Sequence, residues 1–167
     1  MPESPMLAEP APALFRSVLG RFATGVAALT ALAGDAPVGM AVNSFASVSL
    51  TPPLVSFCVA HRSTTWPALR ASGRLCVNFL AEHQEPLSRR LAGAAAERFR
   101  GVAWSGSPNG LPVLDGVLGW LECTIEDEHR AGDHDIVVAR VDSLWARPDG
   151  EPLVFFRGGY GGFLRRD

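Results

Sequence analysis

Carboxylates and two histidines are concentrated between residues 126 and 135, in the segment EDEHRAGDHD. These residue types can hold a metal ion or contact a polar substrate. His129 and His134 are separated by five positions and by Gly132, and an odd step along a strand directs side chains to opposite faces. The spacing therefore favours a solvated loop, with a substrate-binding loop as the second interpretation and a metal site as the third.

A second polar segment, NSFASVS over residues 43–49, interleaves an amide and three hydroxyls with Phe45 and Val48. It follows a predicted strand and precedes the Pro52–Pro53 pair, which breaks any central strand. Such a segment offers side-chain and backbone donors to a polar ligand beside an aromatic ring. A polar turn without a ligand has the same composition, so the residues alone leave both interpretations open.

Most familiar catalytic patterns are missing from the chain. Its three cysteines, Cys58, Cys76 and Cys123, stand in apolar stretches typical of buried small side chains. No CxxC pair, Walker A motif or GxSxG motif occurs. The run Gly159-Tyr160-Gly161 lacks the third glycine of a dinucleotide fingerprint and follows the last predicted strand instead of the first. These absences argue against a zinc ribbon, a P-loop, a serine hydrolase and a Rossmann domain.

Hydrophobic periodicity predicts the elements that must position these residues. Leu14, Phe15, Val18, Leu19 and Phe22 recur at helical spacing and predict a helix over 13–23. Further helices are expected over about 65–72 and 84–99, and strands over 25–32, 38–42, 54–60, 75–80, 117–126, 136–144 and 153–156. Because helices do not alternate with strands, an antiparallel barrel with peripheral helices fits better than a parallel sheet.

Composition bounds the class of protein. The chain has 167 residues, 47% of them hydrophobic and 19% charged, which suffices for one packed core. Residues 1–12 contain four prolines and are expected to form a loose arm ahead of one domain over 13–167. The net charge is −2 and the 15 basic residues are scattered arginines, which argues against a nucleic-acid partner. Without a leader or a membrane-length apolar run, a cytoplasmic protein with no membrane partner is expected.

Taken together, several segments resemble the short-chain NAD(P)H:flavin oxidoreductases, the reductase components of two-component flavin-dependent monooxygenases. The similarity extends over about residues 14–163. It is carried by FATGV at 22–26, GMAVNSFASVSLTPPLV at 39–55, SGRLCVN at 72–78, GDH at 132–134 and PLVFFRGGY at 152–160.

The resemblance implies an FMN-binding split β-barrel, antiparallel and of Greek-key type, with peripheral helices. It also implies a homodimer with flavin near the subunit interface, and a partner monooxygenase that receives the reduced flavin. The expected cofactor is FMN or FAD, and the expected electron donor is NADH or NADPH. Neither choice can be made from the matched segments.

The resemblance further implies two sets of site residues. Those expected to bind flavin are Ala41, Val42, Asn43, Ser44, Phe45, Ser47, Val48, Cys58, Val59, Ala60, Ser63, Thr64, Thr65 and Arg90. Those expected to bind the nicotinamide cofactor are Gly132, Asp133, His134 and Tyr160. One departure concerns Arg90-Leu91, where many relatives have Arg-Phe.

Such a reductase needs no general base and no nucleophile. Hydride passes directly from nicotinamide C4 to flavin N5, which requires stacked rings and a protein that orients them. No catalytic side chain is therefore expected. The alternative is a non-catalytic flavin- or haem-binding module on the same barrel, because one fold hosts many functions. The GDH segment and Tyr160 favour the enzyme, since a binder needs no nicotinamide site.

Overall fold

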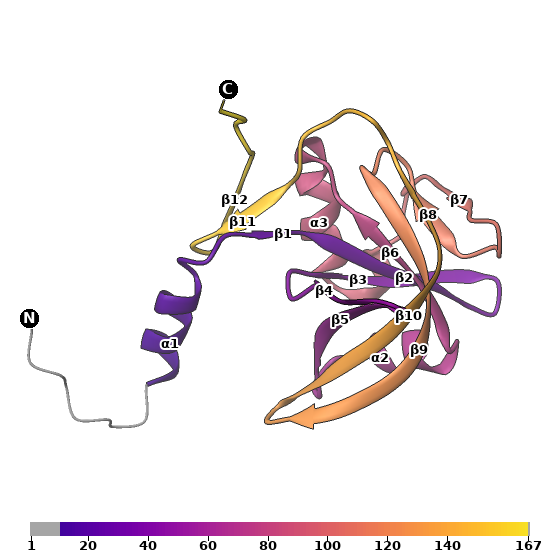
Figure 1. The fold of residues 1–167 in the computed structure, drawn as a ribbon, viewed down its shortest axis with the longest axis horizontal. Coiled ribbons are helices and arrows are strands. Elements are labelled where there is room, and N and C mark those ends of the chain that lie inside the picture. The colour runs from indigo at the N-terminus through magenta and orange to yellow at the C-terminus, as the bar shows by residue number, and fades with distance from the viewer. Residues whose placement is uncertain (1–10, 167) are drawn as a thin grey trace, which may run out of the picture.

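The structure is a computed structural model that describes residues 11–166, and antiparallel β-strands dominate it (Figure 1). The helices are α1 (Pro12–Leu19), α2 (Trp66–Ala71) and α3 (Glu85–Leu91), with short 3₁₀ helices η1 (Glu82–Gln84) and η2 (Ala95–Glu97). The strands are β1 (Thr24–Gly25), β2 (Ala27–Ala33), β3 (Ala36–Val42), β4 (Ala46–Leu50), β5 (Pro53–Ala60), β6 (Arg74–Phe79), β7 (Trp104–Gly106), β8 (Pro112–Leu114), β9 (Gly119–Ala131), β10 (His134–Ala146), β11 (Val154–Phe156) and β12 (Gly159–Gly161).

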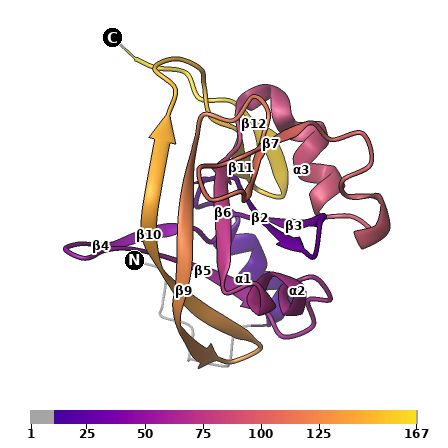
Figure 2. The same ribbon diagram turned by 90° about the vertical axis from the view of Figure 1, so that its right-hand side faces the viewer.

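A seven-stranded antiparallel sheet in the order β3-β2-β6-β9-β10-β5-β4 forms the body of the molecule. Strand β5 shows why its residues form a strand with one buried face: Val55, Phe57 and Val59 are buried, and the side chains between them are not. Figure 2 shows α2 and α3 beside this sheet. A three-stranded sheet in the order β1-β11-β12 and a two-stranded sheet, β7-β8, complete the fold. The expectation of a mostly β, antiparallel protein with peripheral helices is confirmed.

Two apolar clusters make up the core. One gathers Leu29, Phe57, Leu69 and Val137 between the large sheet and α2, and the other gathers Val26, Leu80, Leu91, Leu114 and Leu153 beneath α3 and β8. Each of these nine side chains is at most 7% exposed. Strand β2 contributes Leu29 to the first cluster and Ala28 to the second, so the large sheet connects the two clusters.

Buried polar groups fasten β7 and β8 to the sheet. The Asn78 amide nitrogen donates to Thr30 Oγ1 at 2.9 Å, and the Asn78 carbonyl oxygen accepts from the Leu114 backbone N–H at 2.9 Å. Farther along, the Glu122 carboxylate accepts from the hydroxyls of Ser107 and Ser143 and from the Asn109 amide. Burial alone would raise the pKa of Glu122, but these hydrogen bonds lower it to about 2.

The prediction of a solvated loop over 126–135 is wrong. Strands β9 and β10 run for 13 residues each and are joined only by Gly132 and Asp133, where Gly132 has a φ of 66°. Positive φ favours glycine, so Gly132 permits the tight turn. The outer part of this hairpin is solvated on both faces, which explains why its charged sequence looked like a loop.

The predicted helix over 84–99 is also interrupted. Helix α3 ends at Leu91, and only η2 follows. Gly93 closes the last turn with a bond to the Arg90 carbonyl, and glycine disfavours continuation of a helix. The intervening chain is held by Arg98, whose Nε donates to the Gly93 carbonyl at 2.9 Å.

Helix α1 stands apart from the large sheet (Figure 1), and none of its residues is buried. It begins at Pro12, so the expected arm over 1–12 lies almost wholly outside the described residues. The helix is also shorter than predicted, because the chain turns after Leu19. Within residues 11–166, no helix has both the length and the apolar character needed to cross a bilayer.

Candidate functional site

The loop that follows β3 is tied to β5 through Ser44. The Cys58 backbone N–H donates to Ser44 Oγ at 2.9 Å, and Ser44 Oγ donates to the Cys58 carbonyl at 3.3 Å. Two segments expected to contact flavin therefore lie side by side, although they are 14 residues apart in sequence. The Ser44 hydroxyl is occupied by the backbone of β5, so its contribution to a ligand site is to hold this loop in place.

The outward face of β5 leads from this loop to the 132–134 turn. Cys58 and Ala60 share the half-buried face of β5, and Ala60 pairs with His134 across the sheet. The His61 backbone N–H donates to the Asp133 carbonyl at 3.0 Å, and the His61 ring contacts Asp135 Oδ1 at 2.8 Å. Two residues of strand span about 7 Å, so the expected flavin strand and nicotinamide turn are neighbours.

The turn presents a histidine held by its neighbour. His134 Nδ1 lies 2.7 Å from Asp133 Oδ1, which leaves Nε2 for a ligand. The pKa of the Asp133 carboxyl is lowered first by this hydrogen bond and then by the charge of His134, with a smaller effect from Arg62. Asp133 itself is fully exposed, so the pair sits at the surface, where a ligand can reach it.

Tyr160 lies in a different cavity from His134. It lines a cavity of about 150 Å³ with Ala41, Val42 and Asn43, and its hydroxyl is 2.9 Å from Ser88 Oγ. The Arg89 guanidinium stacks over the Tyr160 ring at 4.9 Å. The structure therefore brings Tyr160 to the start of the expected flavin loop, and not to the 132–134 turn with which it was grouped.

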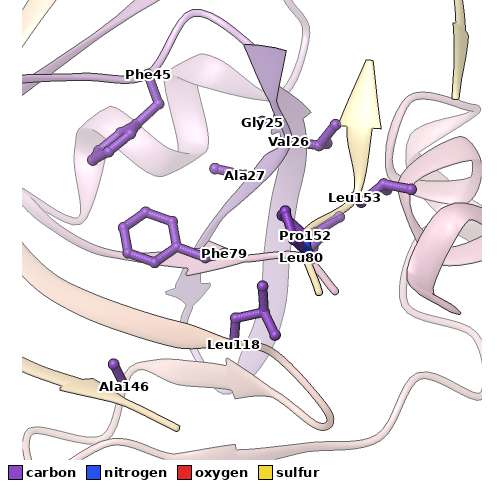
Figure 3. A pocket seen from close by; sticks show the side chains of 10 residues that line it. All are labelled: Gly25, Val26, Ala27, Phe45, Phe79, Leu80, Leu118, Ala146, Pro152 and Leu153. Carbon is purple, nitrogen blue, oxygen red and sulfur yellow. The ribbon is translucent and has the colours of Figure 1, made fainter. Parts of the chain in front are cut away.

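Phe45 borders a larger, apolar cavity of about 440 Å³, shown in Figure 3. Its ring meets the Phe79 ring edge to face, with centroids 5.3 Å apart. Gly25, Ala27 and Leu118 line the same hollow. Planar aromatic ligands favour such apolar walls with few polar groups. Together with the Tyr160 cavity, this hollow places open space on both sides of the β3–β4 loop.

Several of the expected flavin residues cannot offer a side chain to a surface ligand. Val42 and Val59 are core residues, 8% and 1% exposed, so only their backbone could contact flavin. Ser47, Val48 and Thr64 are exposed. Ser63 accepts from the Trp66 backbone N–H at 3.1 Å and lines a cavity of about 350 Å³ with Ala60 and Trp66. The Trp66 indole N–H is buried and has no acceptor within the described part of the chain.

Arg98 is a residue that the sequence did not single out. Its Nη1 donates to Thr65 Oγ1 at 2.6 Å and to the Gly39 carbonyl at 2.9 Å, and burial lowers its pKa. Arg90, the expected phosphate contact, donates instead to the Arg100 carbonyl. The cation beside the 63–65 segment is thus Arg98. The sequence did contain a signal for Arg98: the dipeptide Arg98-Phe99 has the Arg-Phe pattern that was expected at Arg90-Leu91.

Comparison with known proteins places the chain in a family. The flavin reductase like domain matches residues 19–163. The chain belongs to the flavin reductase family of two-component systems. A flavin reductase of Pseudomonas putida is 44% identical over 153 residues, covering 91% of this chain and 90% of the relative. The reductase subunit HsaB of a flavin-dependent monooxygenase from Mycobacterium tuberculosis is also 44% identical, over 94% of this chain and 85% of its own length.

Solved structures of this flavin reductase family agree in fold. A nitrilotriacetate monooxygenase component B homolog from Mycobacterium thermoresistibile is 44% identical with a TM-score of 0.87, covering 90% of this chain and 85% of that chain. The NADH:FAD oxidoreductase SgcE6 of Streptomyces globisporus is 32% identical with a TM-score of 0.89, covering 98% and 99%. The family expected from the sequence motifs is confirmed.

Proposed function

We propose that this chain is an NAD(P)H-dependent flavin reductase that supplies reduced FMN or FAD to a separate monooxygenase. The observation that carries this proposal is the continuity of β5, bonded at Cys58 to the 43–45 loop and at its end to the 132–134 turn. Membership of the flavin reductase family supports the same reaction. Bound flavin supplies the chemistry by accepting hydride from the nicotinamide ring.

The chain's own part is to bind and orient the two ligands. The face of β5 that carries Cys58 and Ala60 would lie against the flavin ring, with Phe45 on the side of the apolar hollow. His134, held by Asp133, would fix the nicotinamide cofactor by hydrogen bonding through Nε2. With both rings against one strand, little further motion is needed before hydride transfer.

The donor set around Ser63 fits the polar end of a flavin. Ser63, Thr64 and the orphaned indole N–H of Trp66 offer donors that ribityl or phosphate oxygens can accept. Arg98 adds a cation beside Thr65, at 2.6 Å from its hydroxyl. Arginine and hydroxyl groups bind phosphate through charge-assisted hydrogen bonds. Arg90 keeps its predicted role as a further phosphate contact, and Ser47 and Val48 keep theirs beside the ring.

The finer architecture belongs to the same proposal. The seven-stranded antiparallel sheet and the similar folds of flavin reductases support a split β-barrel of Greek-key type. The apolar side chains of α1, together with Phe22, are 52–76% exposed, and such a surface supports a homodimer. Burying that face in a partner subunit would place the flavin near the interface.

An anaerobic spectrum tests the reaction. The purified protein is mixed at catalytic concentration with FMN or FAD, NADH or NADPH is added, and the flavin band is followed. Rapid bleaching is the expected result, and the four pairings give both preferences. Flavin binding without bleaching would overturn the proposal in favour of a binding module. Absence of flavin binding would overturn it too, and haem would be the next ligand to titrate.

A further inference from the structure

A cavity of about 530 Å³ lies between α1 and the 132–134 turn. Pro12, Phe15 and Arg16 form the wall from α1, and Asp133 and His134 form the wall from the turn. Its third side is the end of β5, from Ala60 to Arg62. The volume falls within the usual range of small-molecule sites.

The charges that line this cavity are mostly positive. Arg16 and Arg62 both face it, and within residues 11–166 neither forms an ion pair. The two histidines of the cavity, His61 and His134, are each bound to a carboxylate. Asp133 is the one acidic residue of the lining, and its carboxylate is engaged with His134 at 2.7 Å. Two guanidinium groups are therefore free for an anion.

We infer that Arg16 and Arg62 form a subsite for the phosphates of the nicotinamide dinucleotide. This inference rests on the proposed function and extends it to residues outside the 132–134 turn. Guanidinium groups bind phosphate oxygens in bidentate fashion, which a compact ammonium group does not do.

The position of the cavity selects the dinucleotide over the flavin phosphate. Its walls include the turn expected to bind nicotinamide, whereas Asn43, Phe45 and Ser63 line other cavities. With its nicotinamide at His134, the dinucleotide would extend through its pyrophosphate toward α1. NADH and NADPH share this bridge, so the subsite serves both donors.

The test compares three arginine-to-glutamine variants, each of which removes the same single charge. Arg62→Gln is expected to raise the KM for NADH about tenfold, as loss of a charge-assisted hydrogen bond would. Arg16→Gln is expected to raise the KM for NADH by a smaller factor, because Arg16 lies on α1, which has no buried residue, and is held less firmly than Arg62 at the end of β5. Arg147→Gln, on the far β10–β11 connection where Arg147 contacts Asp149, is the matched control and leaves the KM unchanged.

Two comparisons separate the sources of phosphate. With 1-benzyl-1,4-dihydronicotinamide, a hydride donor without phosphate, Arg62→Gln should match the wild type. With FMN and riboflavin, the ratio of their KM values should not change in the variant. An unchanged KM for NADH in both cavity variants would overturn the inference. So would a loss confined to FMN, which would place the flavin phosphate there.

A binding measurement keeps this inference separate from the proposed reaction. Titration calorimetry of ADP into the flavin-free protein is expected to show binding that Arg62→Gln weakens about tenfold and that rising salt weakens further. Equal ADP affinity in the wild type and Arg62→Gln overturns the subsite. Failure of the wild type to reduce flavin with either donor overturns the proposed function, whatever the outcome of the ADP titration.

Discussion

Two polar regions of the molecule differ in how completely their hydrogen-bonding groups are paired within the protein. Around Glu122, a fully buried carboxylate accepts from Ser107, Asn109 and Ser143. Around the end of β5, His61, Arg62 and His134 line a cavity at the surface. Each histidine uses one ring nitrogen on a carboxylate, and within residues 11–166 the Arg62 guanidinium forms no ion pair. Saturated hydrogen bonding in the first region stabilises the fold, whereas the second can exchange water for a ligand. The two regions are therefore distinguished by whether their polar groups are paired within the protein, and not by how polar they are.

The largest expected effect is on the framework. Replacing Glu122 by alanine removes the buried acceptor shared by Asn109, which is exposed, and by the half-buried Ser107 and Ser143. We expect the free energy of unfolding to fall by about 3 kcal/mol, and Glu122→Gln to cost roughly half of that. Urea denaturation monitored by circular dichroism measures both. Glu126→Ala, on the solvated part of β9, is the control, and equal losses in the two alanine variants would contradict the distinction.

Acid should act through the same carboxylate. Its pKa in the folded protein is about 2, below the ordinary 4.5, so the unfolded chain binds the proton more readily. The stability due to Glu122 is therefore complete above about pH 4.5 and is lost as the pH falls toward 2. Urea midpoints at pH 5, 4 and 3 should decline more steeply for the wild type than for Glu122→Gln. Parallel declines would show that other groups govern acid unfolding.

At the ligand side, we expect function to change without loss of stability. His134→Ala should raise the KM for NADH about tenfold, with little change in the unfolding midpoint, because the His134 ring is bonded to the exposed Asp133 and alanine keeps the backbone pairing of the strand. His129→Ala is the matched control, since His129 pairs with Asp127 at 3.2 Å on the same hairpin. If both variants changed the KM alike, the 132–134 turn would lose its assigned role.

Ser44 combines features of both regions, since it is exposed but bonded within the protein. Its replacement is expected to have the smallest effect. It is exposed, yet its hydroxyl joins the 43–45 loop to Cys58. Ser44→Ala should weaken flavin binding by about 1 kcal/mol, which is roughly fivefold in Kd, through a less ordered loop. Fluorescence quenching of FMN measures this change, with Ser105→Ala on β7 as the control. Unchanged affinity would remove the loop from the flavin site.

Much of this organisation could be predicted from the sequence, and the failures have physical causes. Alternating or apolar runs identified β5, β6 and most of β9 and β10, because burial of one strand face imposes a period of two. The outer hairpin escaped this signal because neither of its faces is buried there, so His129 and Arg130 alternate with nothing apolar. Helix α3 was extended too far because alanine-rich sequence near Gly93 is helical only by propensity.

The candidate site shows the same limit. The resemblance to the family located the segments of the candidate site, but it could not predict which of their polar atoms are already hydrogen-bonded within the protein. The hydrogen bond of Ser44 to Cys58 and the contact of Arg98 with Thr65 join residues 14 and 33 positions apart. Such contacts depend on how the strands meet, which one sequence does not encode in any local pattern. His61 was missed for this reason, since its partner Asp135 is 74 positions away.

The long β9–β10 hairpin has one more consequence. Nine residues of strand separate Glu122 from Gly132, a span of about 30 Å that places the turn far from the buried hydrogen bonds of Glu122. The side chains of Asp133 and His134 can therefore change with little effect on the buried core, whereas Gly132 is required for the positive φ of the turn. Under the proposed function, the ligand-contacting side chains of this turn can vary in sequence independently of the buried framework around Glu122.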